Sequence, residues 1–509
     1  MKNKGPIRLA RLLGVLAIVA FGSRARADDP PPPPVPPPPE GVDVQARGPV
    51  HEAYAEPTGA APAPGTVAPQ APPADINEVP PDQRPEGDNV QWIPGYWAWD
   101  DDSHGYIWVS GFWRIPPPAR RWLPGHWQAI DGGWQWVAGF WAPDDLTQVQ
   151  YLPAPPPLPD QPAPPPAPDP NSVYVPGIWV YQQAQYMWRP GFWVPFRPGW
   201  VWSPANYVWT PNGCLFFEGY WDRPLGERGL LFAPVRFGPA WRGGAFVPSF
   251  VVNTDFLLGA LFVRTAAHHF YFGDYFDKGY ANRGFVAWPD YRIGRVGFDP
   301  NFSYYRHLYT GHPEWEKNLH ELYHARAAGT IARPPRTWNQ QVQAVRTLPG
   351  NRTAFVHNDI HVTHVENVSV LSPLAQAHNV HVTGLAGLAR TPVANVPAHV
   401  VKLEPVTRDV HAREVQAAAQ LRESAALRRN TEAKVLSSGG PRPLLHTDPP
   451  HVAALNLPKP IPHVEVPRPG PVVAPRVAPP IPVMPQHEVR AIPKFEPHPL
   501  PRPPIPVKR

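Results

Sequence analysis

The residues whose spacing is most specific for a reaction are His320, Glu321 and His324, which fit the pattern H-E-x-x-H. On a helix the two histidines share a face and can hold zinc, with Glu321 as the base for a bound water. A zinc peptidase needs a third protein ligand, yet no glutamate occurs between Glu321 and Glu366. The segment after His324 also lacks the further histidine of related metalloprotease motifs. We therefore expect helix-surface histidines, and a zinc-dependent peptidase is kept as a remote alternative.

A second set of possible metal ligands is His357, His361 and His364, with His378 and His381 further along the chain. Paired histidines can bind transition metals even in loosely structured segments. If the segment is a strand, His357 and His361 lie on one face and His364 on the other. We expect adventitious metal affinity here rather than a dedicated site. The prediction is therefore no catalytic residue, no cofactor and no metal, with His320, His324, His357 and His361 as the candidates to test.

Cys214 is the only cysteine of the chain, so an intrachain disulfide is excluded. It begins an apolar run that continues to Phe217. In such a run a thiol behaves as a small hydrophobic side chain. We expect Cys214 to be buried and unreactive.

The elements that would position these residues are dominated by a six-residue repeat, aromatic-x-x-Gly-x-Trp. Units begin at Trp92, Trp108, Trp122, Trp136, Tyr174, Trp188 and Phe216. A degraded copy, Trp202–Tyr207, has Ala for Gly and Tyr for the last Trp, which completes two sets of four units. A repeat of this kind outweighs local structure predictions. Its characteristic residues are Trp92, Gly95, Trp97, Trp108, Gly111, Trp113, Trp122, Gly125, Trp127, Trp136, Gly139, Trp141, Gly177, Trp179, Trp188, Gly191, Trp193, Gly219 and Trp221.

The residues around each unit favour short antiparallel strands. Asp131-Gly132 is a hairpin turn signal between aromatic segments, and Asp100 to Gly105 and Pro211 to Gly213 are similar. Aromatics five positions apart fall on opposite faces of a regular strand. We infer that Pro-Gly marks a bulge or bend that restores a shared face, with a tight turn between very short strands as the alternative. Most tryptophans must then form the core, because a meander of short strands has no other source of one.

Two stretches, Tyr106 to Trp113 and Tyr186 to Trp193, resemble the repeat that names the YXWGXW (WXXGXW) repeat proteins of bacteria. The resemblance covers about residues 92–221. It implies an exported protein of the bacterial envelope and carries no established activity and no catalytic residues.

The organisation predicted along the chain is mainly β, with two repeat blocks, a further β-rich segment, two helices and long disordered Pro-rich segments. We expect a signal peptide over 1–27, a Pro-rich disordered spacer over 28–88, repeat block 1 over 89–151, a Pro-rich linker over 152–172, repeat block 2 over 173–223, an aromatic β-rich segment over 224–312, a helix over 313–329, Arg/His-rich extended chain or short strands over 330–405, a second helix over 406–436, and a Pro-rich basic disordered tail over 437–509.

Composition points to an exported, non-enzymatic protein. The basic start, short apolar run and Ala25-Arg26-Ala27 are typical of a cleaved signal, and no later stretch is long enough to span a membrane. The 79 prolines argue against one compact globule. We expect a structural or interaction protein of the periplasm, cell envelope or extracellular space, with two rigid modules held apart by proline spacers. Envelope polysaccharide, peptidoglycan or another envelope protein is the expected partner, and nucleic acid is not. A carbohydrate- or cell-wall-binding module is the alternative, because sugars stack on exposed indoles.

Overall fold

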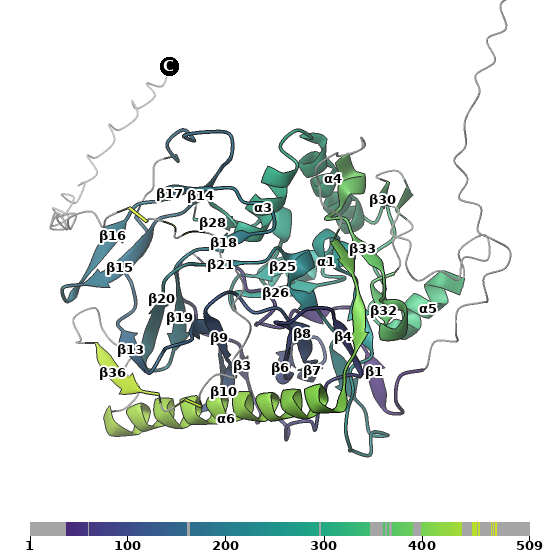
Figure 1. Ribbon diagram of the computed structural model, residues 1–509, viewed down its shortest axis with the longest axis horizontal. Coiled ribbons are helices and arrows are strands. Elements are labelled where there is room, and N and C mark those ends of the chain that lie inside the picture. Colours follow the sequence, from purple (N-terminus) through teal and green to yellow (C-terminus); the bar gives the residue numbers. More distant parts are fainter. Residues whose placement is uncertain are drawn as a thin grey trace, which may run out of the picture. The chain divides into compact units, whose positions relative to one another are not determined.

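The computed structural model describes residues 37–59, 61–159, 163–294, 297–346, 360–361, 364–365, 369–389, 399–439, 450–455, 457–458, 470, 472 and 474–475. The described residues from Pro38 onward belong to one compact unit. Strands outweigh helices, and most strands are arms of short antiparallel hairpins (Figure 1). The predicted mainly-β fold class is therefore confirmed. The predicted signal peptide, 1–27, lies outside the described residues.

In block 1 the first repeat unit pairs with the second, and the third pairs with the fourth. The two units of each pair form the two arms of a hairpin, and each arm is interrupted at its Gly. The first double hairpin pairs the units that begin at Trp92 and Trp108, and the second pairs those that begin at Trp122 and Trp136. Their strands are β5 (Gln91–Ile93), β6 (Tyr96–Asp100), β7 (Gly105–Val109), β8 (Phe112–Arg114), β9 (Arg120–Leu123), β10 (His126–Ile130), β11 (Gly133–Val137) and β12 (Phe140–Pro143). The Asp131-Gly132 turn joins β10 to β11, as predicted.

Block 2 repeats this construction with two further double hairpins, and the degraded copy takes part in the second of them. The strands are β14 (Ser172–Val175), β15 (Ile178–Gln182), β16 (Gln185–Arg189), β17 (Phe192–Pro195), β18 (Val201–Ser203), β19 (Asn206–Thr210), β20 (Gly213–Phe217) and β21 (Tyr220–Asp222). The eight units therefore form four structurally equivalent double hairpins.

In every double hairpin the first aromatic residue of one unit lies opposite the last aromatic residue of its partner. Trp92 faces Trp113, and Trp97 faces Trp108. The eight such pairs are edge-to-face or tilted, with ring centroids 5.1 to 5.4 Å apart. Edge-to-face aromatic pairs each contribute about 0.5–1.5 kcal/mol beyond the area that they bury. The spacing of the repeat is thus a pattern for cross-strand aromatic pairing.

The glycine of each intact unit is required by the close approach of an aromatic ring of the partner unit. The strands on both sides of Pro-Gly pair with the same partner unit, so the segment is a bend and the alternative of a tight turn is wrong. None of the repeat glycines has a positive φ. A Cβ at Gly111 would lie 2.7 Å from Cζ2 of Trp92, and one at Gly219 would lie 2.6 Å from Cζ2 of Trp202. Only glycine leaves room for the partner ring at this point.

The segment that precedes block 1 is ordered over most of its length, which corrects the predicted spacer over 28–88. It contributes β1 (Val42–Val44), β2 (Gly48–Pro49), β3 (Val67–Ala68) and β4 (Gln83–Pro85), and His51, Glu52 and Tyr54 are buried. Extended proline-rich chain leaves its carbonyls free. Here Ala74 O accepts from Trp97 Nε1 at 3.0 Å, and Gln83 O accepts from Trp113 Nε1 at 2.9 Å. The indole N–H groups of block 1 therefore find acceptors in the backbone carbonyls of this segment, and these hydrogen bonds hold the segment against the block.

The two blocks share a sheet, which corrects the prediction of modules held apart by proline spacers. Strand β13 (Gln148–Leu152), at the end of block 1, pairs with β20 of block 2 and with β36 (His451–Ala454) from the predicted tail. Phe140 and Phe217 stack with ring centroids 4.4 Å apart. The predicted linker lies along block 2, where Pro157 O accepts from Trp179 Nε1 at 3.1 Å. The linker packs against block 2 because its carbonyls accept hydrogen bonds from the indole N–H groups of that block.

The segment after block 2 is β-rich as predicted, and it extends the sheets of block 1. Strand β23 pairs with β1 and β7, β22 pairs with β8, and β26 pairs with β2 and β25. Its strands are β22 (Gly229–Leu230), β23 (Val235–Phe237), β24 (Phe250–Val252), β25 (Leu261–Arg264), β26 (His269–Phe272), β27 (Phe285–Ala287), β28 (Arg292–Ile293) and β29 (Gly297–Phe298). Short helices α1 (Thr254–Gly259), α2 (Lys278–Asn282) and α3 (Pro300–Leu308) interrupt it and were not predicted.

The two predicted helices are present. Helix α4 (Glu314–Ala328) ends at Gly329 in the left-handed conformation, and its stripe of Trp315, Leu319, Leu322 and Tyr323 is buried. Helix α6 (Arg408–Gly439) runs along block 1 against β5, β9 and β10 (Figure 1). Between them lie α5 (Trp338–Arg346), which was missed, and the short strands β30 (Ile360–His361), β31 (His364–Val365), β32 (Leu371–Pro373), β33 (Val380–Val382), β34 (His399–Val401) and β35 (Leu403–Pro405).

No helix of the described part of the chain has the length and apolar character needed to cross a bilayer. Cys214 is buried as predicted, and burial raises the pKa of its thiol to about 12. The thiol therefore stays protonated and unreactive at neutral pH.

Candidate functional site

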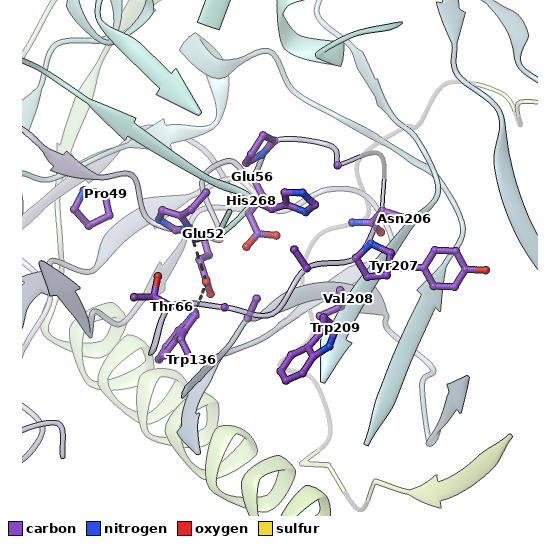
Figure 2. Close-up of a pocket in the computed structure, with 18 of the residues that line it drawn as sticks. Pro49, Glu52, Glu56, Thr66, Trp136, Asn206, Tyr207, Val208, Trp209 and His268 are labelled. Carbon is purple, nitrogen blue, oxygen red and sulfur yellow. Dashed lines mark hydrogen bonds and ion pairs between the residues drawn. The ribbon is translucent and has the colours of Figure 1, made fainter. Parts of the chain in front are cut away.

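An open cavity lies where the N-terminal segment, both repeat blocks and the hairpin β25–β26 meet (Figure 2). Block 1 contributes Tyr96, Trp127 and Trp136 to its wall, and strand β19 of block 2 contributes Asn206 to Trp209. Its polar residues include Glu52, Glu56, His268 and His269. A cavity with aromatic walls and a few convergent polar groups is the usual form of a ligand-binding site.

Three of these polar side chains form a cluster that sequence reasoning did not identify. Glu52, Glu56 and His269 each offer one possible ligand atom, and these atoms lie within 4.8 Å of one another. Nδ1 of His269 is 4.0 Å from Oε1 of Glu52. Among the described side chains no other group of three or more His, Cys, Asp or Glu gathers in this way.

The backbone around Glu52 is fixed by a buried turn. Tyr54 N donates to His51 O at 2.8 Å, and His51 Nε2 lies 3.1 Å from Pro94 O at the Pro-Gly bend of β5–β6. Arg114 Nε and Trp141 Nε1 both donate to Ala53 O. These bonds tie the turn to block 1, so the direction of the Glu52 side chain is set by the repeat itself.

The carboxylate of Glu52 is itself bound to block 1. It accepts a hydrogen bond from Trp136 Nε1 (Figure 2). It accepts another from Gly139 N at 3.0 Å, and the side chain is 2% exposed. Glu56 is half-buried and makes no hydrogen bond to any described residue. One carboxylate of the cluster is therefore held in place, and the other has no partner among the described residues.

The cavity shifts the proton affinity of all three groups. Burial raises the pKa of Glu52 to about 7, although hydrogen bonds from Gly139 and Trp136 act in the opposite direction. Burial, together with the charge of Glu52, raises the pKa of Glu56 well above its usual range. Burial lowers the pKa of His269 to about 4. At neutral pH the imidazole is neutral, and the pKa of Glu52 lies close to the pH, so the cluster can exchange protons and, on losing them, accept a cation.

Beside the cluster (Figure 2), His268 has an unusual backbone conformation. It lies in the turn between β25 and β26 with a φ of 47°, in the left-handed region that side-chain-bearing residues seldom adopt. Such residues cluster at functional sites, where the surrounding structure maintains them. Here the conformation presents His268 and His269 as neighbours on the cavity wall.

A second buried carboxylate, Glu78, occupies the equivalent place in the first double hairpin. It accepts from Gly95 N at 2.7 Å, Gly111 N at 2.9 Å and Trp108 Nε1 at 2.9 Å. We refer to Glu52 and Glu78 as the brace carboxylates, because each joins a repeat Gly and a repeat Trp at the centre of a double hairpin. Glu78 serves structure alone, whereas Glu52 also faces the cavity.

The candidate zinc ligands of the sequence lie elsewhere. His320 and His324 are on α4, but Nδ1 of His320 pairs with Asp290 at 3.1 Å and Glu321 pairs with Lys317 at 3.6 Å. No third ligand joins them among the described side chains. The side chain of His361 and all of His357 lie outside the described residues. The H-E-x-x-H match is thus a helix-surface arrangement in the described part of the chain.

The repeat tryptophans are mostly internal, as the need for a core predicts. Trp92, Trp108 and Trp113 have no exposed surface, whereas Trp179, Trp188 and Trp193 of block 2 are half-buried. The cavity wall includes two repeat tryptophans, Trp127 and Trp136. It also includes Trp209, which lies outside the repeat motif.

The cluster was missed because Glu52 and Glu56 lie in a segment interpreted as disordered. A signal was nevertheless present: the stretch His51 to Ala55 includes a tyrosine and has no proline. Such a stretch inside a proline-rich segment favours local folding.

No protein-family model, curated protein or solved structure matches this chain at a significant level.

Proposed function

We propose that this protein is an exported protein of the bacterial cell envelope with a structural and interaction role rather than a catalytic one. The observation that carries the proposal is the mutual pairing of all eight repeat units. The most specific feature of the sequence is used to build a rigid scaffold, and the resemblance to YXWGXW repeat proteins supports the envelope location.

The partner surface that this scaffold offers is on block 2. Trp193, Trp200 and Trp202 are half-buried there, and together with Tyr174 they border two hollows shared with α3. Half-exposed indoles beside apolar hollows are typical of contact surfaces for other macromolecules. We propose envelope polysaccharide, peptidoglycan or another envelope protein as the partner, and not a nucleic acid.

A second candidate function is carbohydrate binding in the cavity. Trp136 and Trp209 are half-buried in its wall, where an indole face can stack on a sugar ring. Asn206, Glu56 and His268 supply polar groups at the same wall. This combination of stacking surface and hydrogen-bonding groups favours a glycan over an apolar ligand.

Fractionation of cells that express the full chain tests the envelope location. We expect the protein outside the cytoplasm, with residues 1–27 absent by mass spectrometry of the N-terminus. Recovery of the uncleaved chain in the cytoplasm would overturn the proposed location.

Binding to purified peptidoglycan and envelope polysaccharide, followed by tryptophan fluorescence, tests the two candidate functions. Trp209→Ala alters the cavity, and Trp193→Ala alters the block 2 surface. Binding lost only in Trp209→Ala supports the cavity as a glycan site, and binding lost only in Trp193→Ala supports the block 2 surface. If neither glycan binds, the carbohydrate candidate is rejected and an envelope protein is left as the proposed partner.

A further inference from the structure

We propose that Glu52, Glu56 and His269 bind a divalent transition-metal ion of the zinc class at the wall of the cavity. The site goes beyond the structural role proposed above, lies in the cavity of the second candidate function, and is separate from the H-E-x-x-H match on α4.

The positions of the three side chains fit a shared ion. Ligand atoms bound to one zinc ion at about 2.0–2.2 Å lie roughly 3–4 Å from one another. The three possible ligand atoms are within 4.8 Å of one another, and His269 Nδ1 lies 4.0 Å from Glu52 Oε1. Small side-chain rotations would bring all three to a common centre without movement of the backbone.

The surroundings of the ligands match those of a metal site. The hydrogen bonds from Trp136 Nε1 and Gly139 N hold the Glu52 carboxylate, and each of its oxygens keeps a second lone pair. Partners of this kind orient the ligands of a metal ion and raise its affinity.

Two carboxylates lie together here without a neutralising ion pair. In the part of the chain that the structure describes, no lysine or arginine forms a salt bridge with Glu52 or Glu56. Arg428, the nearest candidate on α6, is bound to Glu432 at 2.8 Å and to Ala138 O at 2.7 Å. Adjacent buried carboxylates without a cation are costly, and a bound dication removes that cost. The unpartnered carboxylate of Glu56 supplies the ligand that no other interaction uses.

The ligand set selects the class of metal. One imidazole with two carboxylates suits Zn²⁺ and similar dications, whereas Ca²⁺ and Mg²⁺ prefer oxygen ligands alone. Three protein ligands leave at least one coordination position, and the cavity gives that position access to water or a ligand. The site therefore has the open form rather than the closed form of a structural zinc site.

Metal analysis of the untagged full chain tests the proposal. After chelation and dialysis, titration with Zn²⁺ is expected to give one bound ion per chain. Glu56→Gln and His269→Asn are each expected to weaken zinc binding by roughly 100-fold or more, beyond the 10–100-fold typical for loss of a supporting partner. The matched control H320N/H324N is expected to keep the affinity of the unaltered chain.

Folding is monitored separately, because a variant that fails to fold would also lose zinc. Glu56→Gln removes a carboxylate that has no hydrogen bond to a described residue, so its metal-free melting temperature is expected to be equal to or above that of the unaltered chain. Co²⁺ in place of zinc gives an absorption spectrum that is expected to change in Glu56→Gln and not in H320N/H324N. Absence of a bound equivalent, or an equivalent lost in H320N/H324N and kept in both cluster variants, would overturn the proposal.

Discussion

The two repeat blocks have the same internal pairing and different surroundings. In both, aromatic residues of partner units face one another at 5.1 to 5.4 Å. Block 1 is covered by the N-terminal segment and α6, and its indoles donate to Ala53, Ala74 and Gln83 carbonyls and to the brace carboxylates. Block 2 receives carbonyls of the proline-rich linker. Each block keeps one buried indole N–H, of Trp92 and of Trp202, that has no hydrogen-bond partner among the described residues.

The difference shows that the repeat determines pairing but does not determine burial. Whether an indole becomes core or surface depends on what the neighbouring segments supply. Proline-rich chain supplies carbonyl acceptors in both blocks. Block 1 also receives buried carboxylates and packs three strands against α6, whereas α6 reaches block 2 where Asn212 Nδ2 donates to Glu432 O at 2.9 Å. Block 1 is therefore the structural half of the repeat region, and block 2 is the half with surface to offer.

The largest expected difference between the blocks is in the loss of one repeat indole. Trp108→Ala removes a fully buried ring and the hydrogen bond to Glu78, so we expect a loss of about 3–5 kcal/mol in the free energy of unfolding. Trp188→Ala, the matched change in a half-buried position, is expected to cost roughly half as much. Denaturant unfolding measures both, and equal losses would contradict the contrast.

The next effect concerns the room that glycine leaves for a ring. A Cβ at Gly111 would meet Trp92 Cζ2 at 2.7 Å and Ile93 O at 2.6 Å, and both belong to rigid surroundings. We expect Gly111→Ala to destabilise the fold by about 3 kcal/mol, the upper end of overpacking.

The control for this prediction is Gly279→Ala on α2, where a Cβ meets nothing within 4 Å. There we expect a gain of about 0.5–1 kcal/mol, because alanine restricts the unfolded chain and favours helix. A neutral result for Gly111→Ala in the same unfolding assay would mean that the close approach of the indole is not a constraint.

A brace carboxylate gives the third contrast. Glu78→Gln keeps the shape of the side chain but replaces one carboxylate oxygen with an amide N–H₂, which faces an N–H donor instead of accepting from it. We expect a loss of about 2 kcal/mol in the free energy of unfolding. Glu218→Gln, at a 61% exposed carboxylate paired with Arg189, is expected to change stability by less than about 1 kcal/mol. Thermal unfolding of the two variants side by side distinguishes a brace from a surface ion pair.

The smallest effect sharpens the comparison inside block 2. In the degraded unit Ala205 stands where other units have Gly, and the partner ring at the equivalent position is Phe216 instead of an indole. We expect Phe216→Trp alone to cost about 1–2 kcal/mol by overpacking. Adding Ala205→Gly should recover most of that loss, and a double-mutant cycle measures the coupling. Independent, additive effects would show that the two positions do not compensate each other.

The sequence was sufficient to predict the strands, the hairpin turns and the internal tryptophans of the repeat. Those features are local: an Asp-Gly turn at 131–132 and aromatic spacing are both visible within one unit. Helices α4 and α6 were also predictable, because Pro313 and Gly329 delimit the first and an Ala- and charge-rich composition marks the second. The short helices α1, α2, α3 and α5 have too few residues to show a clear periodicity.

The cover of block 1 and the cavity could not be predicted in this way. Composition alone classifies residues 28–88 as disordered, since prolines make few hydrogen bonds of their own. What orders the segment is the supply of indole donors more than ten residues away, as between Ala74 and Trp97. Likewise Glu52 and His269 are 217 positions apart, and no local pattern connects them.

The central claim is that most repeat indoles of block 1 are internal and most of those of block 2 are partly accessible. Modification of the native chain with N-bromosuccinimide, followed by peptide mass spectrometry, tests it directly, with the urea-unfolded chain as the reference in which every tryptophan reacts. We expect Trp92, Trp108 and Trp113 to stay unmodified while Trp179, Trp193 and Trp200 react. Equal modification of the two sets in the native chain would contradict the contrast between the blocks.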